Sequence, residues 1–362
     1  MREFNYKQYV ADILDKDVID LLTSIYAKKG VVEYFINSNP ELVKGYAEIT
    51  KVQNAVSAYR KTRYPGVAIK KVFEWKLGLC DSCNDRIERC WELQDEWLSN
   101  DNGSFVIDKE YIDSFSEIFS SLNWFGIGRK KEKYRSSDGV YALCDGGSYA
   151  DKNSIDIELV IAEDIENYLE LMTIGLKDVL LDGVNPLLVL PMFLADMIKI
   201  TPFGSYDEEV AYLTMLRVLF NGDFESIKYI SLIRFLEQNR IKLLESIEKS
   251  LESWNEGNND YKHVVIAFLE IVDEMYQQST EQIVPLYTRK MNKQERIDHA
   301  ISTYGTIFTK VEISILCPDA SSSSIENVLA DYSGWKINGG RAAAYDPLGF
   351  KAGVRHYYLR YD

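Results

Sequence analysis

Three consecutive acidic residues follow a short loop between two strongly apolar segments, and they are the first candidates for chemistry. The loop and its acidic end read Thr201-Pro202-Phe203-Gly204-Ser205-Tyr206-Asp207-Glu208-Glu209. Clustered carboxylates bind divalent cations such as Mg²⁺, and acidic residues in the first turn of a helix also stabilise its N-terminus. Both interpretations are open, and we favour helix capping because it requires no ligand.

The segments on either side of this loop have helical periodicity. Residues 184–200 are mostly apolar but contain Pro191 and Asp196, and they are shorter than the roughly 20 apolar residues that span a bilayer. We therefore expect a buried helix that ends near Ile200. The acidic run predicts that a second helix begins at Glu208 and continues to about Asn221.

Residues 187–245 resemble the Fic (Fido) family, whose signature HPFxxGNGRxxR lies between two such helices. Pro202 and Phe203 stand at the proline and phenylalanine of the motif. The later pair Asn239 and Arg240 resembles an asparagine-arginine pair that follows the motif in the family. An N-terminal helical layer, a hairpin before the motif and a C-terminal winged helix also occur in bacterial Fic proteins, so the resemblance covers nearly the whole chain.

The resemblance implies a phosphate-binding loop and a defined reaction. In the family, the loop at the helix N-terminus holds the phosphates of ATP, and arginines clamp them. The motif histidine takes the proton from a target hydroxyl as that hydroxyl attacks the α-phosphate, and AMP is transferred. An acidic residue before the first motif glycine lies near Mg²⁺.

This chain departs from the motif at the residues that carry that chemistry. Thr201 stands at the histidine, Ser205 at the acid beside magnesium, and Tyr212 at the last arginine, while the glycine-asparagine-glycine-arginine run reads Tyr206-Asp207-Glu208-Glu209. A threonine hydroxyl is no general base near neutral pH, and carboxylates repel a triphosphate. We therefore predict a Fic-type helical bundle without the standard AMP-transferase activity, and we expect no cofactor.

The cysteines indicate neither a metal centre nor a disulfide framework. The chain has five, and Cys80 and Cys83 form a CxxC pair with Cys90 as the next cysteine. These supply three zinc ligands where a structural site needs four. We expect ordinary buried or half-exposed thiols on a helix, and the pattern assigns no role to Cys80 and Cys83.

Helical periodicity also organises the rest of the chain. It predicts helices over residues 17–29, 40–63, 70–98 with an interruption, 163–181, 185–200, 208–221, 231–254 and 260–278. Turn-forming residues between 124 and 157 flank a strand-like run at 140–143, which predicts a β-hairpin. The periodicity breaks near Pro285. We therefore divide the chain into an N-terminal helical layer (1–115), a Fic-like core (116–285) and a winged-helix-like domain (290–362).

The last domain resembles a winged helix because three short helical patterns precede a Gly339-Gly340 turn. From residue 291 to the end it has eight Lys and Arg and eight Asp and Glu, so it lacks the basic face that supplies most non-specific DNA affinity. We favour contacts with a protein over contacts with DNA. Arg341, in the expected wing, is the one candidate DNA contact.

The composition excludes some further classes. The chain has 362 residues and a formal net charge of −15, which argues against a general nucleic-acid coat protein. No secretory pattern opens the chain, so we expect a cytoplasmic protein that does not act at a membrane. We predict a binding or regulatory module with a protein partner. The alternatives are a nucleotidyl- or phospho-group transferase that uses ATP, Mg²⁺ and the acidic loop, and a winged-helix transcriptional regulator; a homo-oligomer is also open.

Overall fold

The structure is a computed structural model, and it describes residues 2–59, 65–99, 105–120, 133–143, 155–204, 206–303, 308–331 and 344–345. These residues are mainly α-helical, as predicted, with two short antiparallel strand pairs. The chain forms two compact units, each built from three segments: Met1–Thr23, Ser99–Asp223 and Asn239–Ile271 in the first, and Ser24–Leu98, Phe224–Gln238 and Val272–Asp362 in the second. The predicted division into three domains stays a prediction.

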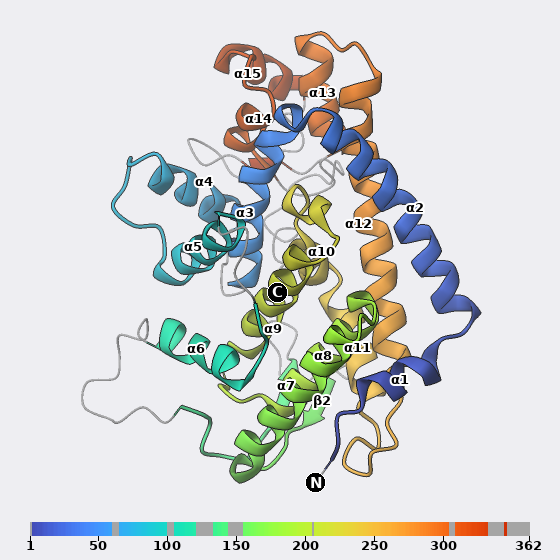
Figure 1. The fold of residues 1–362 in the computed structure, drawn as a ribbon. Coiled ribbons are helices and arrows are strands. Elements are labelled where there is room, and N and C mark those ends of the chain that lie inside the picture. Colours follow the sequence, from blue (N-terminus) through green and yellow to red (C-terminus); the bar gives the residue numbers. More distant parts are fainter. Residues whose placement is uncertain are drawn as a thin grey trace. The chain divides into compact units, whose positions relative to one another are not determined.

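The first unit is a helical bundle built around one buried helix, α8. Its elements are α1 (Tyr6–Ile13), α6 (Lys109–Ser120), β1 (Val140–Leu143), β2 (Ile155–Glu158), η2 (Ala162–Asp164), α7 (Ile165–Leu181), α8 (Pro186–Ile200), α9 (Asp207–Asn221) and α11 (Arg240–Ser250), with the first parts of α2 (Lys16–Ser38) and α12 (Lys262–Thr288). α8 packs against α7 and α9, as Figure 1 shows. The predicted hairpin is confirmed, because Val140 pairs with Glu158 and Leu143 with Ile155.

The sequence explains where α8 begins and why it is buried. Asn185 accepts a hydrogen bond from the backbone N–H of Leu187 at 3.0 Å, and Pro186 occupies the first helical position, where its missing N–H costs nothing. Every residue from Leu187 to Ile200 is buried, which accounts for the nearly continuous apolar run. The helix ends at Ile200, as predicted, and α9 begins at Asp207, one residue before the predicted start.

A buried carboxylate ties two distant segments to α8. Asp196 is fully buried and accepts hydrogen bonds from the hydroxyls of Tyr6 and Tyr261, both at 2.6 Å, and from the indole N–H of Trp254 at 2.7 Å. Arg2 donates to the Trp254 carbonyl at 2.7 Å and to the Tyr261 hydroxyl at 2.8 Å. Burial raises the pKa of Asp196. Because its donors come from α1 and from the segment between α11 and α12, this carboxylate fixes the position of α8 within the unit.

The second unit contains two groups of helices that share α3. Its elements are the rest of α2, η1 (Pro40–Val43), α3 (Lys44–Ala58), α4 (Pro65–Lys76), α5 (Asp85–Ser99), η3 (Glu225–Lys228), α10 (Leu232–Gln238), the rest of α12, α13 (Lys293–Thr303), β3 (Phe308–Thr309), α14 (Lys310–Leu316), α15 (Ser322–Asp331) and β4 (Ala344–Tyr345). α13, α14 and α15 pack together, and α14 also packs on α3 (Figure 1).

A glycine lets α14 approach the start of α3. A Cβ atom added at Gly45 would lie 2.6 Å from the backbone oxygen of Ile315, which is closer than non-bonded atoms come. Buried polar side chains also join these helices, because Gln53 of α3 donates to the fully buried Glu312 of α14 at 3.3 Å. The C-terminal helices are therefore part of the second unit and not a separate tail.

Three predicted helix boundaries are wrong. Gly30 does not end the first long helix: α2 continues to Ser38 because its buried face continues through Val32 and Ile36. The helix predicted over 231–254 is interrupted at Asn239, where α10 ends and α11 begins. Pro285 lies inside α12, which continues to Thr288, so this proline removes one backbone donor without ending the helix.

The predicted β-turn of the C-terminal domain is outside the described residues, as are Gly339, Gly340 and Arg341. One strand pair of this domain is described, in which Phe308 pairs with Tyr345 and Thr309 with Ala344. Within the described ranges, no helix combines the length and hydropathy needed to cross a bilayer.

Two glycines of the second unit give a matched test of this packing. Gly45→Ala should lower the free energy of unfolding by about 1–3 kcal/mol, because the new methyl group meets the Ile315 carbonyl. Gly30→Ala should instead raise it by about 0.5–1 kcal/mol, since Gly30 is inside a helix and nothing lies within 4 Å of its Cβ position. Denaturant unfolding of both variants measures the difference. Equal effects of the same sign would show that α3 and α14 do not come this close at Gly45.

Candidate functional site

The site that the sequence predicts begins where α8 ends, at a strained threonine. Thr201 has φ 41° in the left-handed region, which β-branched residues rarely adopt. Its N–H donates to the Met197 carbonyl at 2.8 Å, and its hydroxyl donates to the Ile198 carbonyl. The side chain is buried, so this hydroxyl satisfies the end of the helix and does not face solvent.

Arg135 closes the end of α8. Its Nε donates to the Thr201 carbonyl at 3.1 Å, and one Nη donates to the carbonyls of Ile200, at 3.2 Å, and Val160. The other Nη donates to the Ser137 carbonyl at 2.8 Å. The last carbonyls of a helix have no partner within the helix, and a cation near them is favourable. Arg135 therefore supplies the hydrogen-bond donors that the carbonyls at the buried end of α8 lack.

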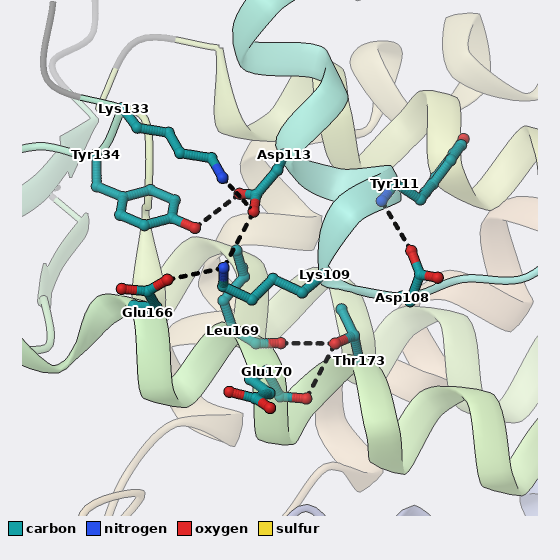
Figure 2. Close-up of polar contacts among 10 residues, drawn as sticks. All are labelled: Asp108, Lys109, Tyr111, Asp113, Lys133, Tyr134, Glu166, Leu169, Glu170 and Thr173. Atoms are coloured by element: carbon teal, nitrogen blue, oxygen red, sulfur yellow. Dashed lines mark hydrogen bonds and ion pairs between the residues drawn. The ribbon is translucent and has the colours of Figure 1, made fainter.

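A cluster around Asp113 of α6 holds the residues that precede Arg135 (Figure 2). The Asp113 carboxylate accepts hydrogen bonds from the Tyr134 hydroxyl at 2.7 Å, from Lys109 at 3.2 Å and from Lys133. Lys109 also forms an ion pair with Glu166 of α7 at 2.8 Å, and these bonds raise its pKa. The cluster fastens Lys133 and Tyr134 to α6, which Lys109 joins to α7, and so places Arg135.

Asp207 fills the backbone cradle at the start of α9. Its carboxylate accepts the N–H of Phe203 at 2.7 Å and also hydrogen bonds with the N–H groups of Gly204 and Asp207 itself. Burial nevertheless raises the pKa of Asp207 to about 6. Backbone N–H groups at a helix N-terminus are the usual site for a phosphate. In this chain a side-chain carboxylate occupies them.

Glu208 forms an ion pair with Arg240, the second residue of the predicted Asn-Arg pair. Both carboxylate oxygens take part, at 3.0 Å and 3.2 Å, in a bidentate arrangement. The Glu208 side chain is 1% exposed and that of Arg240 is 20% exposed. Arg240 also donates to the hydroxyl of Tyr141 in β1 at 3.0 Å, so the pair joins α9, α11 and the hairpin. Asn239 is the N-cap residue of α11 and makes no side-chain cap.

Aromatic rings pack along the loop. The rings of Phe203 and Tyr206 stack with centroids 5.0 Å apart, and Tyr206 also lies 5.4 Å from Phe119 of α6. Pro202, Tyr206, Glu209 and Tyr212 are buried, Phe203 is half-buried and Gly204, at φ 74°, is exposed; Ser205 is outside the described residues. The described loop is therefore filled by its own side chains.

Among the described residues, neither the acidic loop nor the CxxC pair forms a set of metal ligands. In the described ranges, no three His, Cys, Asp or Glu side chains are grouped so that they could hold a metal ion. Asp207 and Glu208 instead contact backbone N–H groups and Arg240. Cys80 and Cys83 lie in the turn between α4 and α5 as free thiols, and burial raises the pKa of Cys83 to about 12, which disfavours a reactive thiolate.

A comparison with solved structures identifies the fold. A Fic family protein from Desulfovibrio desulfuricans G20 superposes with a TM-score of 0.54, over 92% of this chain and 96% of that one, at 10% identity. The chain has a Fic-type fold. At this identity the likeness is one of fold alone. No protein-family model matches the chain, and no curated protein matches its sequence significantly.

The sequence found part of this site. It indicated the loop and the Asn239-Arg240 pair, and the structure brings Arg240 to Glu208. It missed Arg135 and Asp113, which come from segments well before the loop. The basic run Lys133-Tyr134-Arg135 was the available signal, but nothing in its spacing connects it to residues 201–207. That the loop is a degenerate Fic motif stays a prediction.

Asp207→Asn tests the buried carboxylate through pH. Its folded pKa of about 6 lies above the ordinary 3.8, so its contribution to stability is complete below pH 3.8 and is lost as pH rises through 6. Relative to the variant, the wild-type free energy of unfolding should fall by up to about 3 kcal/mol between pH 4 and 7. Denaturant unfolding at several pH values measures this difference. Parallel curves for the two proteins would contradict a buried Asp207 carboxyl group with a raised pKa.

A double-mutant cycle tests the pair between Glu208 and Arg240. Arg240→Ala should cost about 3 kcal/mol of unfolding free energy because it leaves Glu208 charged and buried. Glu208→Ala should cost less, since Arg240 is partly exposed. The double variant should cost less than the sum, with a coupling of about 2 kcal/mol by denaturant unfolding. Additive effects would show that the two side chains do not interact in solution.

Proposed function

We propose that this chain is a non-catalytic Fic-fold protein that acts by binding a protein partner. The observation that carries the proposal is that the loop's anion-binding groups hold internal anions. Asp207 accepts a hydrogen bond from the Phe203 N–H, and Glu208 accepts two hydrogen bonds from the Arg240 guanidinium. A triphosphate in this position would have to displace two buried carboxylates, and it would meet their charge at close range.

The residue at the histidine position supports the same proposal. A general base must reach the proton that it removes and have a pKa near the working pH. Thr201 meets neither requirement, because its hydroxyl donates to the Ile198 carbonyl and is buried. No specific observation favours the alternative transferase that would use Mg²⁺ and the acidic loop. The experiment with labelled ATP below tests for AMP transfer by this mechanism and by the standard one.

The C-terminal helices favour a protein partner over DNA. If α13 to α15 are the three helices of a winged helix, α15 would be the reading helix. Glu326 is exposed on α15, and Lys310 of α14 forms an ion pair with it. Phosphate contacts need unpaired Lys and Arg side chains, so this face suits a protein surface better. We place the protein in the cytoplasm on the sequence alone.

The proposal predicts no AMP transfer from ATP. The wild-type protein, incubated with labelled ATP and Mg²⁺, should label neither itself nor bulk protein. A variant that restores the family motif should gain ATP binding by titration calorimetry; it carries Thr201→His, Tyr206→Gly, Asp207→Asn, Glu208→Gly, Glu209→Arg and Tyr212→Arg. The single variant Glu209→Arg is the control and should not bind, because Asp207 and Glu208 still occupy the loop. Labelling by the wild-type protein that disappears in Glu208→Ala would overturn the proposal.

A further inference from the structure

The exposed face of α2 in the second unit carries no charge. The structure describes every residue from Ser24 to Ser38, and those exposed to solvent are Tyr26, Ala27, Gly30, Val31, Tyr34, Asn37 and Ser38. None of them is charged, although 27% of the residues in the chain are. A helix face in contact with water usually carries charged side chains, whereas protein interfaces are depleted of charge and enriched in tyrosine. This face therefore has the composition of an interface.

The charged residues of the same stretch make their bonds within the unit. Lys28 forms an ion pair with Asp273 of α12 at 2.7 Å, and Lys29 forms one with Glu33 at 2.8 Å. Glu33 also accepts a hydrogen bond from the hydroxyl of Ser226 in η3 at 2.9 Å. In this unit α2 lies beside α12, as Figure 1 shows, and its charges lie on the side of these contacts. The opposite side keeps the aromatic and small residues.

Nothing in the described part of the chain requires a glycine at position 30. Gly30 is inside the helix, its φ is not positive, and no atom lies within 4 Å of where its Cβ would be. Alanine would make this helix more stable, because glycine loses more conformational freedom when a helix forms. A glycine is needed where another backbone comes close. The approach of a second helix to this face would account for Gly30.

The residues around Gly30 have a two-fold pattern. Tyr26 lies four positions before it and Tyr34 four positions after it, so the three form one row along the helix surface. Two identical surfaces that pair about a two-fold axis exchange their contacts, with residue i on j and residue j on i. With antiparallel helices and the axis at Gly30, each Tyr34 would face Tyr26 of the second copy. The two glycines would face each other where the helices cross.

We propose that this face of α2 binds a second copy of the chain, as an antiparallel pair of helices centred on Gly30. Charge favours this arrangement, because two chains of net charge −15 repel each other, and an uncharged face adds no local repulsion. Tyr26, Val31 and Tyr34 are 40%, 44% and 72% exposed, so pairing would remove substantial apolar surface from water. The proposal is independent of the function proposed above, because the loop at 201–212 takes no part in it.

The pair should be weak and reversible. About four turns of one helix offer less area than the roughly 800 Å² per partner of stable complexes. We therefore expect a dissociation constant of about 10–500 µM. Sedimentation equilibrium of the full chain should show monomers at about 1 µM and mostly dimers at about 1 mM. Added salt should strengthen the pair, because it screens the repulsion between two acidic chains.

Two variants with the same new charge locate the contact. Tyr34→Glu should weaken the pair at least about ten-fold, because it places a carboxylate inside an apolar contact. Leu77→Glu is the matched control: Leu77 is 71% exposed in the same unit, in the turn after α4, and is not on α2. It should leave the dissociation constant unchanged.

Gly30→Ala separates loss of contact from loss of folding. It should weaken the pair about five-fold, because two methyl groups would meet where the helices cross. The same variant should unfold at a higher denaturant concentration when it is studied as a monomer at about 1 µM, since alanine is the better helix former. A merely structural role for Gly30 would not move association and stability in opposite directions.

A mixture of two variants tests the antiparallel arrangement. Tyr26→Lys and Tyr34→Glu should each pair more weakly than the wild type. In an equimolar mixture, the lysine of one copy would face the glutamate of the other, and the remaining two tyrosines would still face each other. The mixture should therefore associate about five-fold more tightly than either variant alone. Parallel helices would gain nothing from mixing, because position 26 would face position 26.

Four results would overturn the proposal. A wild-type chain that stays monomeric up to about 1 mM would do so. Equal effects of Tyr34→Glu and Leu77→Glu would place the contact elsewhere. A pair that weakens as salt is added would be held by ion pairs and not by this uncharged face. A mixture no tighter than its components would exclude the two-fold arrangement about Gly30.

Discussion

The junction between α8 and α9 is governed by one requirement: buried backbone groups at helix ends must find partners. α8 is buried along its length, so its last carbonyls cannot rely on water, and the N-terminal residues of α9 are buried as well. Arg135 satisfies the carbonyls of Ile200 and Thr201, and Asp207 satisfies N–H groups of the loop. The rest of the site supports these two side chains.

The same requirement explains why a carboxylate can lie where a phosphate lies at other helix N-termini. A phosphate site leaves its N–H groups pointing into an accessible space, where the ligand completes their hydrogen bonds. Here the completing carboxyl group is part of the chain itself. A carboxylate covalently held in place competes without the entropy cost that a free ligand pays. Glu208 repeats this arrangement with Arg240 of α11, so the backbone N–H groups of the loop and this guanidinium each hold a carboxylate of the chain itself.

The sequence predicted elements whose pattern is set locally. α8 followed from its apolar run, and the hairpin followed from its turn residues. The errors came where packing overrides a local signal. Glycine often ends a helix, yet the apolar face of α2 continues past Gly30 and so does the helix. Pro285 is likewise tolerated inside α12. Asn239 breaks a helical pattern because it begins a new helix whose first residue, Arg240, pairs with Glu208.

The candidate site could be located from the sequence but not assembled, because its hydrogen bonds join residues far apart in the chain. Arg135 and Thr201 are 66 positions apart, and Arg240 and Tyr141 are 99 apart. No periodicity records such a pairing, so the acidic run could only be interpreted from its own composition. Charge alone suggested capping or metal binding. The structure gives Asp207 and Glu208 separate partners, backbone N–H groups for the first and Arg240 for the second, and the composition of the run could not reveal this division.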